Sequence, residues 1–77
     1  MEIEVLFYGM VSEAACMSSI KYQNVKDTDE LSEQLTALFP QLQNMTYIMA
    51  LNQEILKENT SINNGDVIAI LPPFAGG

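Results

Sequence analysis

Several residue types that build enzyme active sites are absent from this sequence or rare in it. There is no histidine, so a histidine-based catalytic triad and an imidazole metal site are both excluded. Cys16 is the single cysteine, which excludes an internal disulfide. No glycine-rich GxxxxGK[ST] loop occurs, so we expect the chain not to bind ATP itself. We therefore expect no bound metal or cofactor in this chain.

Positive charge is also scarce. Three lysines stand against ten acidic residues, arginine is missing, and the formal net charge is −7. Binding to nucleic acid or to an anionic membrane depends on Lys and Arg, so we expect neither of these partners. A protein partner with a basic docking face fits the charge better. No hydrophobic run is long enough to span a bilayer, and the start Met1-Glu2-Ile3-Glu4 is acidic where a signal peptide is basic. These features predict a cytoplasmic protein.

The first half of the chain predicts two strands separated by a short helix. Ile3 to Tyr8 alternates as a strand, with Leu6 and Tyr8 on one face, and Gly9 ends it. Val11 to Met17 has two alanines and no helix breaker, which favours a short helix or helical turn. Ser18 to Gln23 is predicted to be a second strand, antiparallel to the first.

A longer helix follows. Asp27 or Thr28 begins it, because Glu30 comes three residues after Asp27 with the spacing of a capping box. Pro40 ends it. The residues predicted to form its buried face are Leu31, Leu35 and Leu38, with Ala37 and Phe39 widening that face.

The second half predicts three more strands. Thr46 to Leu51 is the first, and Asn52-Gln53 forms a tight turn into a short edge strand, Glu54 to Lys57. Asn64-Gly65 is a second turn, because both residues tolerate positive φ. The last strand, Val67 to Leu71, is apolar on both faces, which is typical of a central strand.

This order of elements predicts an α+β fold. Pairing the central last strand with the first strand gives a β-grasp (ubiquitin-like) roll, with a mixed sheet of four to five strands and one main helix on one face. The other face of the sheet stays uncovered, so Leu6, Tyr8, Ile55 and Leu71 are predicted to form an outward apolar patch. Such a patch usually marks a surface for a partner.

Five polar residues have both a structural and a functional interpretation. Asp29, Glu30 and Glu33 are best explained as a solvated helix start, favoured by the helix dipole, rather than as a metal site. Cys16 is expected to be a small buried hydrophobic residue rather than a persulfide carrier. Asp66 is expected to be a turn or cap residue rather than an acid catalyst.

The last six residues, Pro72 to Gly77, have a different composition. Two prolines forbid further strand pairing and hold the backbone extended, and two glycines follow with no side chain to bury. Without Cβ atoms, such a tail can enter a narrow channel and present the carboxylate of Gly77. We therefore predict a folded domain over residues 1–71 and an extended, flexible tail over residues 72–77.

The combined pattern closely resembles the MoaD/ThiS family of sulfur carriers, and within it the small subunit of molybdopterin synthase. The resemblance rests on Ile3-Glu4-Val5-Leu6-Phe7-Tyr8, on Asn52-Gln53, on Gly65-Asp66-Val67 and above all on Leu71-Pro72-Pro73-Phe74-Ala75-Gly76-Gly77. It spans the whole chain. One departure is Ser12, which stands where many members carry an arginine after the first strand.

The resemblance implies a function for the tail. A ubiquitin-activating-like adenylyltransferase, using ATP and Mg²⁺, would adenylate the carboxylate of Gly77, next to Gly76. Sulfur from a cysteine-derived persulfide would then convert it into a thiocarboxylate. The tail would enter the large subunit of molybdopterin synthase, in a heterotetramer, and deliver sulfur to cyclic pyranopterin monophosphate. This chain would be a non-catalytic subunit without an active site of its own. The residues implied to bind partners are Tyr8, Ile55, Leu71, Pro72, Pro73, Phe74 and Ala75.

Three other functions stay open. A sulfur carrier of the same kind serves thiamine thiazole, cysteine or tRNA thiolation, although Pro72-Pro73 and the length of 77 residues favour molybdopterin. A ubiquitin-like modifier would instead join Gly77 to a lysine through an isopeptide bond. A passive interaction module would not use the tail at all.

Overall fold

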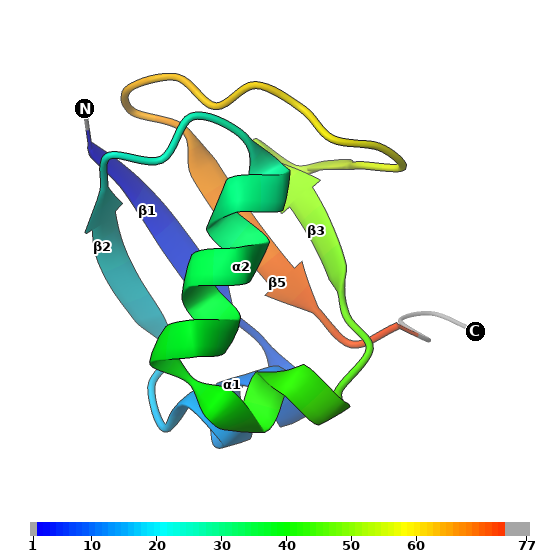
Figure 1. Ribbon diagram of the computed structural model, residues 1–77. Coiled ribbons are helices and arrows are strands. Elements are labelled where there is room, and N and C mark those ends of the chain that lie inside the picture. Colours follow the sequence, from blue (N-terminus) through cyan, green and yellow to red (C-terminus); the bar gives the residue numbers. More distant parts are fainter. Residues whose placement is uncertain (1, 74–77) are drawn as a thin grey trace.

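The computed structural model describes residues 2–73 of the chain, and Figure 1 shows their arrangement. The elements follow the predicted order, with an added short 3₁₀ helix. They are β1 (Glu2–Phe7), α1 (Gly9–Ala15), β2 (Ser19–Gln23), α2 (Thr28–Leu38), the 3₁₀ helix η1 (Pro40–Asn44), β3 (Ile48–Leu51), β4 (Glu54–Ile55) and β5 (Val67–Leu71).

The described strands form a five-stranded mixed sheet in the order β2-β1-β5-β3-β4. β5 lies in the centre, parallel to β1 and antiparallel to β3, while β2 and β4 form the edges. Neighbouring strands therefore pair with both edges of β5, while only its Ile68 and Ile70 side chains are buried in the core. The predicted β-grasp fold, with the last strand beside the first, is confirmed.

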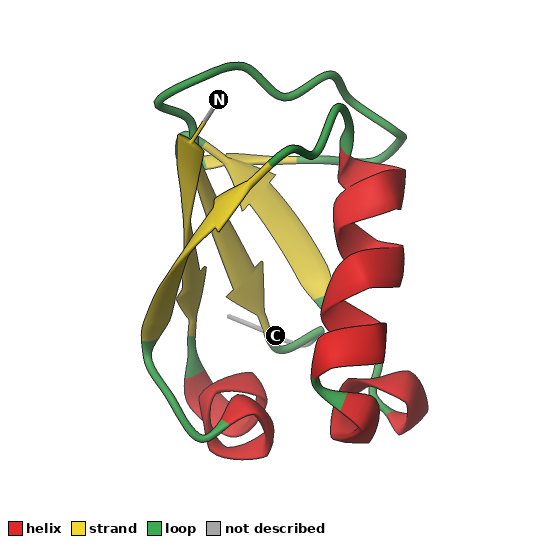
Figure 2. Cartoon of the chain, turned by 60° about the vertical axis from the view of Figure 1, so that its left-hand side comes forward, coloured by secondary structure: helices red, strands yellow, loops and turns green. Residues whose placement is uncertain are grey.

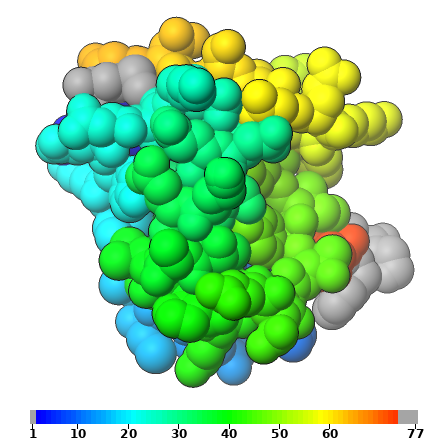
Figure 3. Space-filling view, viewed as in Figure 1, coloured from blue at the N-terminus to red at the C-terminus, as the bar shows by residue number. Residues whose placement is uncertain are grey.

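α2 and η1 lie on one face of this sheet, and α1 lies at one end of it (Figure 2). Seen from the helical side, α2 covers the middle of the molecule (Figure 3). The core fills the space between α2 and the sheet. Its fully buried side chains include Val5 of β1, Leu31 and Leu35 of α2, and Ile68 and Ile70 of β5. The opposite face of the sheet carries none of the helices among residues 2–73, as the sequence predicted.

The start of α2 and its end before Pro40 were predicted correctly, but part of its buried face was not. Asp27 is the N-cap, and its side chain accepts a hydrogen bond of 2.8 Å from the Glu30 amide. At the other end Leu38 is 51% exposed and Ala37 is also exposed, so their predicted places on the buried face are wrong. The chain leaves the helix at Phe39, whose ring packs edge-on against Phe7 with centroids 5.6 Å apart. The prediction that Phe39 widens the buried face is confirmed, because Phe39 packs against the core.

The hairpin of β3 and β4 is shorter than predicted. The Asn52-Gln53 turn is confirmed, and both residues have positive φ (49° and 74°), as in the turns that favour tight hairpins. β4 pairs only at Glu54 and Ile55, after which the Leu56 amide donates to the Met49 carbonyl at 2.9 Å. The predicted strand to Lys57 thus stops two residues early, because β4 is an edge strand without a second neighbour to hold it.

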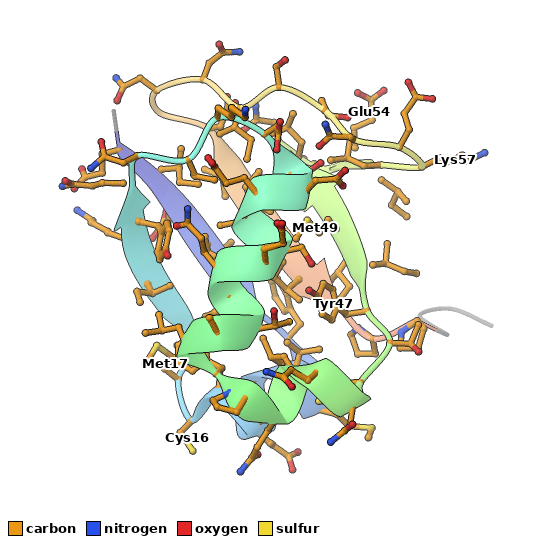
Figure 4. All side chains as sticks on the ribbon, viewed as in Figure 1. Cys16, Met17, Tyr47, Met49, Glu54 and Lys57 are labelled. Atoms are coloured by element: carbon orange, nitrogen blue, oxygen red, sulfur yellow. The ribbon has the colours of Figure 1, made fainter. Side chains whose placement is uncertain are left out.

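Cys16 is exposed, so the prediction that it is a buried small residue is wrong. It is the C-cap of α1 and has a left-handed backbone conformation, with φ of 60°. The cap reverses the chain at the end of the helix and directs the side chain away from the core, at the end of the molecule that carries α1 (Figure 4).

Candidate functional site

The face of the sheet opposite the helices is the first candidate site. Ile68 and Ile70 of β5 point into the core, so Val67, Ala69 and Leu71 point to the other face. The strand register adds Leu6 from β1, opposite Ala69. It also adds Ile48, opposite Leu71, from β3, and Ile55, opposite Ala50, from β4. We call this apolar surface the open face. It is defined by Leu6, Tyr8, Ile48, Ile55, Val67, Ala69 and Leu71.

A hollow of about 290 Å³ lies within the open face. It is lined by Leu6, Tyr8, Asn52, Gln53, Val67 and Ala69. The alanine at position 69 leaves room between the larger side chains of β1 and the β3–β4 turn. Tyr8 stands at its edge and is 47% exposed. A hollow with an apolar floor and an aromatic residue at its edge is suited to receive an apolar side chain of a protein partner.

Charged residues border the open face on its β2 side. Glu2 and Glu4 of β1 lie on the same face as Leu6. Lys21 of β2 lies opposite Glu4 in the register of the two strands. All three are exposed. The apolar area is therefore confined to the end of β1 near Phe7 and to β5, β3 and β4. An apolar centre with a polar rim is the usual arrangement of a protein interface.

The predicted partner-binding residues Tyr8, Ile55 and Leu71 all lie on the open face. Ile55 is 58% exposed, and Leu71 is half-buried. Their role in binding remains a prediction. Our sequence analysis missed Val67 and Ala69. The alternation along β5 could have identified both, because they share the face of Leu71.

The exit of the tail is the second candidate site. β5 ends at Leu71, and Pro72 and Pro73 line a groove of about 280 Å³. The rest of this groove comes from Met10 and Val11 of α1, Asn44 of η1, and Met45 and Thr46 after it. Phe74, Ala75, Gly76 and Gly77 lie outside the described residues, as does the predicted flexibility of the tail.

Asp66 has the predicted turn role. One carboxylate oxygen accepts a hydrogen bond from the Asn63 amide at 2.7 Å, and the other accepts one from Asn52 Nδ2 at 3.0 Å. Asn52 Oδ1 in turn accepts from the Val67 amide at 2.9 Å. These bonds tie the β3–β4 turn to the start of β5, so they hold one wall of the hollow in place.

Ser12 also has a structural role. Its hydroxyl donates to the Met17 carbonyl at 3.2 Å, and its own carbonyl accepts from the Met17 amide at 3.3 Å. The residue that departs from the family pattern therefore closes the turn between α1 and β2.

Among residues 2–73, no group of three or more His, Cys, Asp or Glu side chains is arranged to hold a metal ion. None of the helices in the same range has the length and apolar character needed to cross a membrane.

Comparison with known sequences gives matches over the full length. A sequence profile of the ThiS family matches residues 5–77. The molybdopterin synthase sulfur carrier subunit of Mycobacterium tuberculosis is 33% identical over 81 residues, covering 99% of this chain and 98% of the relative. The subunit of the same name from Chlamydomonas reinhardtii is 31% identical over 83 residues, covering all of both chains.

Solved structures share the fold. A Pyrococcus furiosus protein described as molybdopterin converting factor subunit 1 aligns with a TM-score of 0.86 at 13% identity, over 95% of this chain and 98% of that one. Small archaeal modifier protein 1 from Methanosarcina acetivorans aligns at 0.83 and 20%, over 99% and 96%.

A third structure is a complex of subunits 1 and 2 of the molybdopterin-converting factor from Helicobacter pylori. It contains a chain that aligns with a TM-score of 0.74 at 29% identity, over the whole of both chains. The full-length sequence matches, together with the sheet order and the exit of β5 at Pro72-Pro73, show that the chain belongs to the MoaD/ThiS family.

Proposed function

We propose that this protein is the sulfur carrier subunit of a molybdopterin synthase. The observation that carries the proposal is the family match, which continues through the tail to residue 77. Two curated relatives with this function in their names also align over almost the entire chain. The fold supports the proposal because β5, the central strand of the open face, leads directly into the tail.

The chemistry that we propose takes place at Gly77. Its carboxylate attacks the α-phosphate of ATP, and pyrophosphate leaves. The terminal sulfur of a cysteine persulfide then attacks the acyl adenylate and displaces AMP. A thiol cleaves the resulting acyl disulfide and releases the thiocarboxylate. Activation supplies the leaving group that a free carboxylate lacks. The enzymes that bind this chain supply the catalytic side chains, and Gly76 keeps the approach to the carbonyl open.

The open face is the proposed docking surface for the large subunit. Its hollow receives an apolar side chain of the partner, while Pro72 and Pro73 direct residues 74–77 toward the partner's pocket. The partner-binding roles of Phe74 and Ala75 belong to this proposal. Docking converts sulfur delivery into a reaction within one complex, which raises the effective concentration of the thiocarboxylate. The product is the dithiolene of molybdopterin, made from cyclic pyranopterin monophosphate, in an assembly with two copies of each subunit.

The test uses the full chain with a purified adenylyltransferase of the family, ATP, Mg²⁺ and a persulfide donor. We expect ATP–pyrophosphate exchange, followed by an intact mass in which one oxygen is replaced by sulfur. Adding the large subunit and cyclic pyranopterin monophosphate should then yield molybdopterin and return the carrier to its original mass. Thiocarboxylate formation without any molybdopterin would contradict the assigned pathway while leaving the carrier chemistry intact.

A matched variant carries one additional alanine after Gly77. One residue moves the carboxylate by up to about 3.3–3.6 Å along an extended chain. This displacement exceeds the tolerance of an in-line attack, in which reacting atoms lie about 3–3.5 Å apart. The variant should melt like the parent, because the core is unchanged, and should form neither adenylate nor thiocarboxylate. Full activity of the extended chain would refute the proposed role of Gly77.

A ubiquitin-like modifier is the main competing function. The likeness to an archaeal modifier protein, at 20% identity, shows the shared fold only and does not favour this function. The two functions differ in their products. A modifier forms an isopeptide bond with a lysine of another protein, which adds the mass of the whole chain to its target.

A further inference from the structure

Gly9 and Pro72 lie close together just beyond the ends of β1 and β5. A Cβ atom placed on Gly9 would lie 2.9 Å from Cγ of Pro72, which is closer than real Cβ contacts come. The pyrrolidine ring is closed onto its own backbone, so Cγ can move only through a change of ring pucker and not by rotation of a free side chain. A larger residue at position 9 must therefore displace the Pro72 ring or the backbone next to it, at the first residue of the tail.

The hydrogen bonds at this point explain why the two strands separate here. The Tyr8 amide donates to the Ile70 carbonyl at 3.1 Å, which is the last bond of the β1–β5 ladder in this direction. In a parallel ladder, the Tyr8 carbonyl would next accept from residue 72, but proline has no amide hydrogen. The Tyr8 carbonyl instead accepts from the Val11 and Ser12 amides, at 3.1 and 3.3 Å, and so begins α1.

Gly9 makes this change of direction possible. Its φ is +56°, a conformation that glycine adopts without steric cost. The chain turns into α1 at Gly9. The Pro72 ring lies in the space that a side chain at position 9 would need. On its other side the tail exit faces Met45 and Thr46 across the groove described above. The first tail residue thus lies close to Gly9 of α1 on one side and borders the groove on the other.

We infer that Gly9 is a positioning residue for the tail, because its missing side chain sets the direction in which Pro72 leaves the sheet. The expected effect of Gly9 on adenylation rests on the proposed function. Pro72 and Pro73 have restricted φ angles, so a displacement at Pro72 is carried to Pro73 and changes the point from which the flexible part of the tail starts. A misplacement of about 1 Å far from the chemistry can cost about 100-fold in rate. We therefore expect Gly9→Ala to lower adenylation at least about tenfold, which leaves room for relaxation of the contact.

The chain provides a matched control at Gly65. Gly65 also has positive φ, +87°, but a Cβ added there would have no neighbour within 4 Å. It lies in the turn before β5, at the opposite end of that strand from the tail. Gly65→Ala therefore introduces the same kind of backbone strain without a clash. Both variants should lower the melting temperature, whereas only Gly9→Ala should impair adenylation.

The experiment measures ATP–pyrophosphate exchange at several carrier concentrations, at a temperature where the parent and both alanine variants are folded. We expect a tenfold or larger fall in kcat/KM for Gly9→Ala, and a change of less than about twofold for Gly65→Ala. The double variant Gly9→Ala/Pro72→Ala should react like Pro72→Ala alone, because the clashing ring atom is gone. Equal rates for the two single variants, or a double variant slower than Pro72→Ala, would overturn the inference.

A second measurement does not depend on the proposed function. Residual dipolar couplings of the free protein report the backbone direction at residues 71 and 74. We expect the couplings at these residues to change in Gly9→Ala and to stay unchanged in Gly65→Ala. Unchanged couplings in Gly9→Ala would refute the positioning role, whatever the activity. An inactive parent with the expected couplings would instead refute the proposed function and leave the positioning role supported.

Discussion

Ile70 and Leu71 are neighbours on β5 that point to opposite faces of the sheet, so substitutions there test the assignment of the open face. Ile70 is completely buried in the core. Leu71 is half-buried on the open face, opposite Ile48 of β3. We predict that Ile70→Ala damages the fold, whereas Leu71→Glu leaves the fold largely intact and weakens binding to the large subunit.

The magnitudes follow from burial. Truncating a fully buried isoleucine to alanine costs about 2–5 kcal/mol, through lost burial and the remaining cavity. This is a large share of the about 5–15 kcal/mol that stabilises a typical domain. Full burial of leucine contributes about 1.5–3 kcal/mol, so losing part of it at Leu71 should cost about 1 kcal/mol. For a domain of this size, 1 kcal/mol lowers the melting temperature by about 4–8 °C.

We expect the two variants to rank in the opposite order for binding, with Leu71→Glu weakening it more than Ile70→Ala. Leu71→Glu places an unpaired charge in the centre of a desolvated interface. A loss of about 2 kcal/mol or more is typical of such a central residue, which corresponds to about 30-fold in Kd. Gln23→Glu is the matched control. It adds the same charge on the same face, at an exposed position of the edge strand β2. Its Kd should change less than about threefold.

Thermal unfolding of the free protein and calorimetric titration with the large subunit give the two readouts. The temperature of the titration is chosen so that each variant is folded. A fall in melting temperature for Leu71→Glu as large as that for Ile70→Ala would show that Leu71 belongs to the core. An unchanged Kd for Leu71→Glu would show that the large subunit binds elsewhere.

Two further predictions concern the scaffold, both measured by urea unfolding. Asn52→Gly should cost about 1–3 kcal/mol, because it removes the hydrogen bonds to Asp66 and Val67 while still allowing positive φ. Asn52→Ala should cost more, because it adds backbone strain, and equal stability of the two would contradict this. Asp27→Ala should cost about 1 kcal/mol through the lost N-cap. Asp29→Ala, in the same helical turn, should cost less, and the opposite order would refute the cap assignment.

Much of the fold could be predicted because its signals are local. The spacing of Asp27 and Glu30 located the start of α2, and the structure places the cap bond at that point. Asn52 helped to locate the hairpin, because asparagine tolerates the positive φ that a tight hairpin turn requires, whereas glutamine does not favour the φ of 74° that Gln53 has. The apolar run of Val67 to Leu71 placed β5 in the centre of the sheet, where Ile68 and Ile70 are buried under α2 and the alternate residues form the middle of the open face.

The open face could be predicted only in part. The alternation along β1 and the two-faced composition of β5 identified Tyr8 and Leu71 as outward residues. The hollow beside them depends on Ala69 lying next to Leu6 and the Asn52-Gln53 turn, and therefore on the register between strands. Register is a property of the assembled sheet, so the sequence did not locate this hollow.

The sequence by itself determined the order of the elements, the starts of α2 and β5, and the family to which the tail belongs. Tertiary structure decided whether Leu38 or Phe39 completes the core, because Phe7 offers the ring that Phe39 packs against. It also decided how the tail leaves the sheet, because Gly9 and Pro72 stand at opposite ends of the sequence and meet only when β1 and β5 pair. Local patterns report the conformation of neighbouring residues, whereas a contact between distant residues exists only after the chain has folded.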